Sequence, residues 1–142
     1  MTTTAKPAPV VRVLVTGGRT YHDQDKVNRT LDRLLADTGP QHRLILITGG
    51  ALGADRLAQL WAEAHADRVD LIVEKADWLK HGKAAGPIRN QRMLDRHRPQ
   101  LVIAFPGGKG TAHMCKIADQ AGIPVVYAAP PARHRSAPRT RL

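Results

Sequence analysis

Cysteine is almost absent from the chain, and its scarcity excludes several kinds of site. Cys115 has no second cysteine with which to form an internal disulfide, and no spacing of cysteine and histidine resembles a zinc site. The seven histidines form no cluster that supports a metal site either. We therefore expect Cys115 to be a buried structural thiol, and we predict neither a metal nor a cofactor.

Long apolar runs are also missing. No stretch of about 18 or more apolar residues occurs, and the opening MTTTAKPAPV lacks the apolar segment of a secretory signal. We therefore expect no membrane span and a cytoplasmic protein. With 142 residues and 42% hydrophobic content, the chain has the length and composition of a single folded domain.

Aromatic residues are scarce, whereas positive charge is abundant. Aromatics make up 4% of the chain, which argues against a platform that stacks single-stranded nucleic acid. Lys and Arg outnumber Asp and Glu by 22 to 12, and the resulting +10 would attract phosphates. However, Arg133, Arg135, Arg139 and Arg141 lie in the last ten residues, and omitting these four leaves +6. We predict a flexible N-terminus (1–10), one domain (11–128) and a disordered basic tail (129–142) whose contact with nucleic acid is weak.

Short β-branched runs alternate with longer amphipathic segments along the chain. The runs predict strands over 11–16, 43–48, 69–74, 101–105 and 123–128, and the segments predict helices over 25–38, 53–66, 87–97 and 111–122. Continuous apolar strands separated by helices are typical of a parallel sheet covered on both faces. The sequence thus predicts an α/β fold, a Rossmann-like doubly wound parallel five-stranded sheet with helices on both faces. With the strand order 3-2-1-4-5 that such units commonly have, ligands bind at the carboxyl edge.

Three glycine clusters follow strands at this carboxyl edge. They are TGGR (16–19), TGGALGAD (48–55) and PGGKGT (106–111), after the first, second and fourth predicted strands. A helix that begins after PGGKGT offers free N–H groups and a positive dipole end to a phosphate. Alternatively, Thr111 only caps this helix and the glycines only form the turn. The ligand-binding residues predicted from the clusters are Gly17, Gly18, Arg19, Gly49, Gly50, Gly53, Asp55, Pro106, Gly107, Gly108, Lys109, Gly110 and Thr111.

Two familiar phosphate motifs fit these clusters poorly. GGKGT lacks the G-K-[ST] ending of a P-loop, because Gly110 separates Lys109 from Thr111. TGGALGA has Thr48 where the first glycine of G-x-G-x-x-G belongs, although Glu74 ends the next predicted strand, where a ribose-binding acid would lie. A dinucleotide site therefore stays as an alternative.

Residues outside the clusters complete the prediction. Trp78 either stacks on a base, closes the pocket as a lid, or anchors its loop in the core. Arg89 and Asn90 lie in the first turn of their predicted helix, facing the same edge, whereas Arg92 and Arg96 are expected to be solvated. In the helix over 53–66, helical spacing predicts that Leu57, Leu60, Trp61 and Ala64 face the core.

The stretches VTGGR, TGGALGAD, ADWLKHGKAAGPIRNQRM and FPGGKGT, in this order and spacing, resemble one protein family. The resemblance is to the YspA-type branch of the SLOG superfamily, Rossmann-like proteins related to the LOG phosphoribohydrolases and to DprA, and it covers roughly residues 11 to 127. It implies a nucleotide or nucleotide-derived ligand held by the glycine loops. It also implies a homodimer, since related SLOG proteins are often dimers.

The LOG enzymes are similar to this chain in P-G-G-x-G-T and in an arginine followed four residues later by methionine, here Arg89 and Met93. They also have a T-x-E-E pattern, whereas this chain has His113 and Met114 in place of both acids. The carboxylate needed to cleave an N-glycosidic bond is therefore missing from that place. Asp55 and Arg89 remain candidate catalytic residues, although Asp55 also fits a helix N-terminal residue favoured by the dipole.

Three functions follow from these observations and stay open at the level of sequence. The first is a sensor or processing protein that binds a nucleotide-like phosphorylated ligand. The second is a LOG-like nucleoside monophosphate phosphoribohydrolase with a rewired acid, and the third is a DprA-like nucleic-acid binder.

Overall fold

The computed structural model describes residues 9–128. The predicted tail (129–142) and most of the predicted flexible N-terminus therefore lie outside the described residues. The strands of the described domain are β1 (Val10–Thr16), β2 (Arg43–Thr48), β3 (Val69–Val73), β4 (Leu101–Ala104) and β5 (Val125–Tyr127). Its helices are α1 (Gln24–Thr38), α2 (Ala54–Ala64), α3 (Trp78–His81), α4 (Ala85–His97) and α5 (Lys109–Gln120), with a 3₁₀ turn, η1 (Gly82–Ala84).

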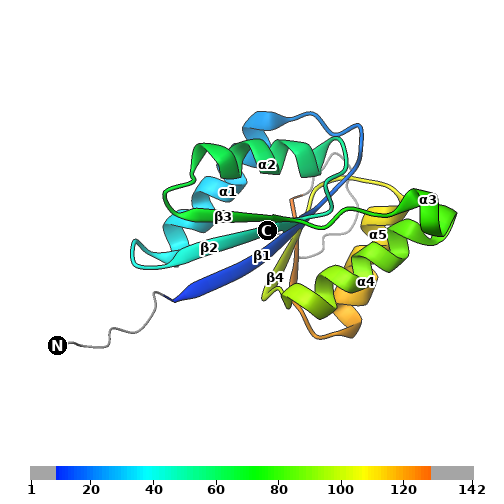
Figure 1. Ribbon diagram of the computed structural model, residues 1–142. Helices are drawn as coiled ribbons and strands as arrows, with labels where there is room; N and C mark the ends of the chain where they lie inside the picture. Colours follow the sequence, from blue (N-terminus) through cyan, green and yellow to red (C-terminus); the bar gives the residue numbers. More distant parts are fainter. Residues whose placement is uncertain (1–8, 129–142) are drawn as a thin grey trace, which may run out of the picture.

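The five strands form one parallel sheet in the order β3-β2-β1-β4-β5 (Figure 1). β1 lies at the centre, where Leu14 is paired with Ile47 of β2 on one side and Val102 of β4 on the other. The predicted fold class and strand order are thus confirmed. The reversal of winding between β1 and β4 places the loops that follow these two strands beside each other.

Helices cover both faces of the sheet because successive side chains of a strand point to opposite faces. Val13 and Val15 of β1 pack in a core with α1 and α2, whereas Leu14 packs in a second core with α4 and α5. Trp61 is only 3% exposed in the first core, as its helical spacing predicted. Cys115 of α5 is buried, as expected.

The stretch between β3 and α4 differs from the sequence prediction, which has no helix there. It contains α3, whose start is capped by the Asp77 side chain accepting the Lys80 N–H at 3.0 Å. α4 also begins at Ala85, two positions before the predicted start at Pro87. Proline tolerates the first turn of a helix, where its missing N–H would have no partner.

No helix within residues 9–128 has the length and apolarity to cross a membrane.

Candidate functional site

A cavity of about 1050 Å³, here called the site cavity, lies at the carboxyl edge of the sheet. Its walls come from the loops after β1, β2, β3 and β4 and from the start of α4. Every ligand-binding residue predicted from the sequence lines it except Gly53. The topology therefore brings together residues that are far apart in the chain.

The glycine loops pack directly on one another behind this cavity. The Gly18 N–H donates to the Pro106 carbonyl at 2.8 Å, and the Ala54 N–H donates to the Gly18 carbonyl at 3.1 Å. A Cβ on Gly17 would lie 2.5 Å from the Cβ of Ala54, and a Cβ on Gly53 would collide with the Gly18 carbonyl. Gly53, which also has φ +76°, therefore packs against the loop after β1 instead of lining the cavity.

The glycines of PGGKGT fall into two groups. A Cβ on Gly107 would collide with the Thr111 hydroxyl oxygen and lie 2.6 Å from the Gly18 nitrogen. By contrast, a Cβ on Gly108 or Gly110 would meet no atom within 4 Å, and neither residue has a positive φ. Packing of the described chain explains glycine at 107 but not at 108 or 110.

The N-terminus of α5 opens into the site cavity. The helix begins at Lys109 after the N-cap Gly108, and no side chain among residues 9–128 caps it. The Ala112 N–H makes a helical bond to the Gly108 carbonyl, so the N–H groups of Lys109, Gly110 and Thr111 precede the intrahelical ladder. Thr111 lies inside the first turn, so the alternative that Thr111 caps this helix is wrong.

Asp55 and Arg89 hold the same peptide segment from two sides. The Asp55 carboxylate accepts the N–H groups of Gly49 and Ala51, each at 3.1 Å, while Arg89 Nη1 donates to the Gly49 carbonyl at 2.6 Å. Burial raises the pKa of Asp55 from 3.8 to about 6, against the opposing effects of these N–H groups and of Arg89. Burial likewise lowers the pKa of Arg89. Both candidate catalytic side chains thus bind the loop after β2, and Asp55 occupies two of its backbone donors.

Asn90 is almost fully buried and connects α4 to α5. Its Nδ2 donates to the Gly110 carbonyl at 3.3 Å and lies 3.1 Å from His113 Nδ1, while its Oδ1 accepts from Arg89 Nε at 3.0 Å. Met114 is fully buried in the core. The two positions that are glutamates in the LOG pattern therefore hold a histidine beside Asn90 and a core methionine, and neither lines the site cavity.

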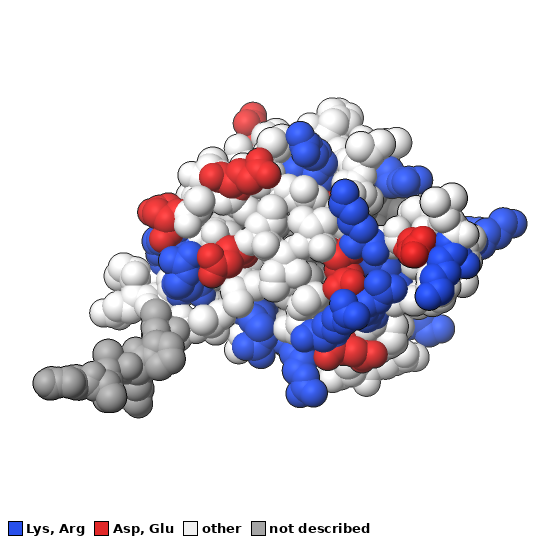
Figure 2. Space-filling view, viewed as in Figure 1, with Lys and Arg blue, Asp and Glu red and all other residues white. Residues whose placement is uncertain are grey.

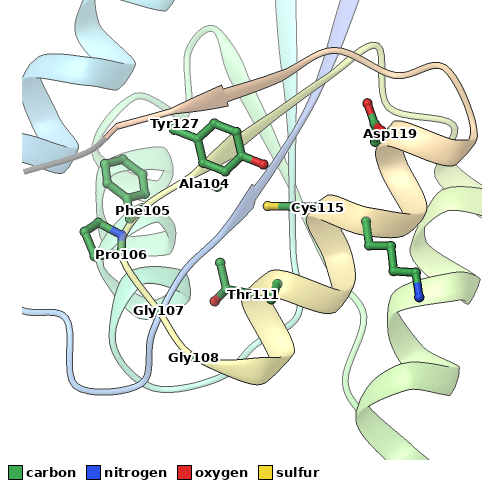
Figure 3. A pocket seen from close by; sticks show the side chains of 11 residues that line it. Ala104, Phe105, Pro106, Gly107, Gly108, Thr111, Cys115, Asp119 and Tyr127 are labelled. Atoms are coloured by element: carbon green, nitrogen blue, oxygen red, sulfur yellow. The ribbon is translucent and has the colours of Figure 1, made fainter. Parts of the chain in front are cut away.

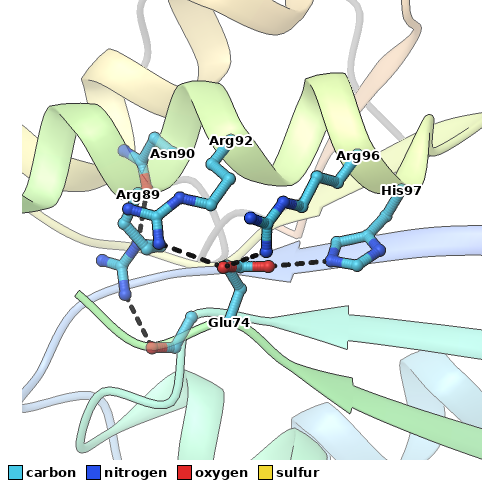
Figure 4. Close-up of polar contacts among 7 residues, drawn as sticks. Glu74, Arg89, Asn90, Arg92, Arg96 and His97 are labelled. Carbon is cyan, nitrogen blue, oxygen red and sulfur yellow. Dashed lines mark hydrogen bonds and ion pairs between the residues drawn. The ribbon is translucent and has the colours of Figure 1, made fainter. Parts of the chain in front are cut away.

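Glu74 lies outside the site cavity and binds α4 (Figure 4). Its carboxylate is 2.9 Å from His97 Nε2, 3.2 Å from Arg92 Nη1 and 3.4 Å from Arg96 Nη1. Burial raises its pKa, but the bonds from His97 and Arg92 and the two arginine charges outweigh this and hold the pKa below its ordinary value. The alternative of Glu74 as a ribose-binding acid is therefore unsupported.

The two arginines that pair with Glu74 differ in their exposure to solvent. The Arg92 side chain is 26% exposed, so the expectation that it is solvated was wrong. The Arg96 side chain is 63% exposed and is solvated as expected, although it also pairs with Glu74. Arg92 is therefore the more sheltered of the two partners.

Trp78 lies on the rim of the site cavity as the first residue of α3. Its side chain is 53% exposed, so the interpretation that Trp78 anchors its loop in the core was wrong. Further lining residues that were not predicted lie inside the predicted clusters or directly after a predicted cluster or strand, and this position was the available signal. They are Thr16, Thr20, Tyr21, His22, Asp23, Ala51, Leu52, Lys75 and Ala76.

Comparisons with known proteins agree with this architecture. The profile of the YspA, cpYpsA-related SLOG family (YAcAr) matches residues 11–81, from β1 to the end of α3. The chain is 38% identical over 120 residues to the Gene 61 protein of Mycobacterium phage D29, covering 81% of this chain and 94% of that protein.

Solved structures show weaker likeness. A UDP-N-acetylglucosamine 2-epimerase matches with a TM-score of 0.49 and 12% identity, over 82% of this chain and 32% of the epimerase. The C-terminal domain of a hydrogenase from Pyrococcus furiosus matches with a TM-score of 0.48 and 15% identity, over 87% of this chain and 96% of that domain. At these values neither structure informs the site. On the family profile and the phage relative, the chain belongs to the YspA, cpYpsA-related SLOG family.

Proposed function

We propose that the protein binds a nucleotide or a nucleotide-derived phosphorylated ligand in the site cavity, as a sensor or as a processing protein. One observation carries the proposal. No side chain among residues 9–128 caps the start of α5 in the cavity, and its N-cap Gly108 and its second residue Gly110 are glycines although no neighbour within 4 Å requires it. Bare backbone at an uncapped helix N-terminus suits the close approach of a phosphate.

The surrounding side chains support the same ligand. Arg19, Lys75 and Lys109 line the cavity and supply positive charge. The half-exposed ring of Trp78 offers a face on which a base can stack. Membership of a SLOG family is consistent with a nucleotide-related ligand.

Binding is preferred to hydrolysis because of the contacts of Asp55. Its carboxylate already accepts two backbone N–H groups and is 5% exposed, so it serves the loop instead of facing a substrate. The alternative of Asp55 as a residue placed at a helix N-terminus fits these contacts better than a catalytic role. A LOG-like hydrolase would need another carboxylate in the cavity, and the only other acid among the lining residues is Asp23.

A thermal-shift screen against nucleotides and nucleotide second messengers tests the proposal. A ligand at ~100 times its dissociation constant stabilises the folded state by about 2.7 kcal/mol. Gly108→Val should fold, since its Cβ has open space, and should lose the ligand-induced shift. Lys109→Ala should weaken binding modestly by removing a charge, and Thr111→Val should cost on the order of 1 kcal/mol of binding. If folded Gly108→Val binds every ligand as wild type does, the proposal fails.

An assay of base release separates binding from catalysis. Wild-type protein incubated with nucleoside monophosphates should release little free base, because the acids of the T-x-E-E pattern are absent. Rapid release that is abolished in Asp55→Asn or Arg89→Ala would overturn the preference for binding and establish a rewired hydrolase.

A further inference from the structure

A second cavity, of about 660 Å³, lies between α5 and the ends of β4 and β5 (Figure 3). Pro106, Gly107, Gly108 and Thr111 line both this cavity and the site cavity. The two cavities therefore share one wall, and that wall is the glycine loop with the start of α5. Nothing in the proposed function uses the second cavity.

The lining of the second cavity suits a polar ring. Figure 3 shows the Cys115 thiol directed from α5 toward Tyr127 of β5, whereas the Thr111 hydroxyl faces the glycine loop at Gly107. The Tyr127 ring is 52% exposed and presents both an aromatic face and a hydroxyl group. Lys116 and Asp119 add one charge of each sign along α5. Ala104, Phe105, Pro106 and Ala112 make the rest of the lining apolar, and this mixture of apolar, hydroxyl and charged groups fits the flat face and the polar edges of a base or a sugar ring.

The part of the shared wall at Gly108 decides whether one ligand can reach both cavities. Gly108 has no side chain that would obstruct a bound group. In addition, no atom of the described chain beyond its two neighbours lies within 4 Å of the place that its Cβ would occupy. The described chain therefore leaves open space at Gly108, a residue that both cavities share. A ligand that ended at a phosphate bound to this wall would fill only the site cavity.

We infer that the two cavities are the two halves of one site, and that the ligand has two arms joined by a diphosphate. Its chemical class is a nucleoside diphosphate esterified at the outer phosphate by a sugar or by a second nucleoside. The nucleoside occupies the site cavity, the diphosphate lies along the shared wall, and the second arm lies between α5 and Tyr127. The inference rests on the proposed function, because it places the phosphates at the start of α5.

Calorimetric titration of the full chain with AMP, ADP and ADP-ribose tests the inference, with the corresponding uridine and guanosine compounds as parallel series. In the series whose base the protein accepts, the two-armed compound should bind at least about tenfold tighter than the mono- and diphosphate. Equal affinity for all three compounds would overturn the inference and leave the proposed function standing. Failure of every compound to bind would overturn both.

A variant that fills the second cavity gives the sharper test. Ala112 is exposed and lines only the second cavity, so Ala112→Phe adds bulk there without entering the core. It should remove the tenfold advantage of the two-armed compound and leave the affinity for the monophosphate unchanged. Ala121→Phe, at an exposed position outside both cavities, is the matched control and should change neither. If Ala112→Phe keeps the full advantage, the second cavity is not part of the site.

Discussion

Gly49 is fixed by Asp55 through its N–H and by Arg89 through its carbonyl. A Cβ on Gly49 would lie 2.6 Å from the Arg89 guanidinium carbon, so the glycine makes room for that arginine. These two side chains come from α2 and α4, on opposite faces of the sheet. The loop after β2 is therefore held by both helical layers.

The titration of Asp55 should appear in the stability of the protein. Its pKa is about 6 in the folded state, compared with 3.8 for an ordinary aspartate. Between pH 3.8 and about pH 6 the folded state therefore binds more protons than the unfolded state. The contribution of Asp55 to the free energy of unfolding should therefore be greatest at acid pH and fall as the pH rises through about 6, by up to about 3 kcal/mol. Asp55→Asn removes this titration. Urea unfolding of both proteins from about pH 4 to about pH 8 measures the difference, and a difference that is independent of pH would contradict the prediction.

Two neighbouring glycines should respond differently to the same substitution. Gly107→Ala should lower the free energy of unfolding by about 1–3 kcal/mol, because its Cβ would collide with Thr111 and crowd the Gly18 nitrogen. Gly108→Ala should change it by less than ~1 kcal/mol, since its Cβ has open space. Thermal or urea unfolding of the pair checks this, with each variant serving as the control for the other. Equal destabilisation would mean that Gly108 is also required by packing.

At the scale of elements, Glu74 attaches α4 to the end of β3 through Arg92, Arg96 and His97. Glu74→Gln should lower the free energy of unfolding at pH 7 by about 1–3 kcal/mol, because the glutamate side chain is only 11% exposed and its basic partners would lose their counter-charge. Since the folded pKa of Glu74 is lowered, its stabilisation is present above 4.5 and is lost as the pH falls below that value. The deficit of the variant should therefore shrink in acid.

The exposed ion pair between Arg43 and Asp70 provides a matched control for Glu74. Its atoms are 2.7 Å apart, but its side chains are 37% and 56% exposed, so water and salt screen the pair. Asp70→Asn should change urea unfolding much less than Glu74→Gln. Hydrogen exchange should also report faster opening of α4 in Glu74→Gln only, and unchanged exchange there would contradict the role given to Glu74.

The five strands and the four long helices could be predicted because each has a clear apolar period. Leu60 and Ala64 of α2 show the limit, since both were predicted to face the core and both are exposed. The buried face instead follows Ala54, Ala58, Trp61 and Ala62, and small alanines give a weak hydrophobic signal. α3 was missed because four residues held by the Asp77 cap have no periodicity to detect.

The candidate site was predictable to the extent that it follows strand ends. Gly17, Gly49 and Gly107 come at or just after the ends of strands of a parallel sheet, so topology alone places them at one edge. The partners of Asp55 and Glu74 could not be predicted, because they depend on which helix faces which loop. The second cavity was also not foreseen, since Tyr127 and Cys115 belong to no motif.

Charge is divided unevenly over the whole molecule. Residues 11–73 contain eight basic and eight acidic side chains, whereas residues 74–98 contain seven basic and three acidic ones. Figure 2 shows basic side chains gathered on the side where Figure 1 places α3 and α4. The excess positive charge of residues 11–98 thus lies in the segment that contains α3 and α4, in addition to the charge in the last ten residues.

This surface should give weak, salt-dependent binding to DNA. Lys80→Glu with Lys83→Glu should reduce affinity for a duplex and lower the slope of log affinity against log salt by about one for each phosphate that the protein no longer neutralises. The exposed pair Arg29→Glu and Arg33→Glu in α1 is the matched control and should have a smaller effect. Fluorescence anisotropy with labelled DNA measures both. Tight binding at physiological salt that survives the Lys80 and Lys83 changes would favour the DprA-like alternative.

The central place of β1 has a consequence for the order in which the chain is made. β1 leaves the ribosome before the other four strands, yet one of its edges pairs only with β4, whose register places Val13 beside Leu101. A nascent chain that ends before Leu101 therefore carries an unpaired apolar strand edge, which other chains can join. The loop of Gly18 likewise has no Pro106 carbonyl to bind until that residue has been synthesised. Translation products that stop short of β4 should therefore aggregate, and a ligand bound as proposed can protect the chain only after the start of α5 has emerged.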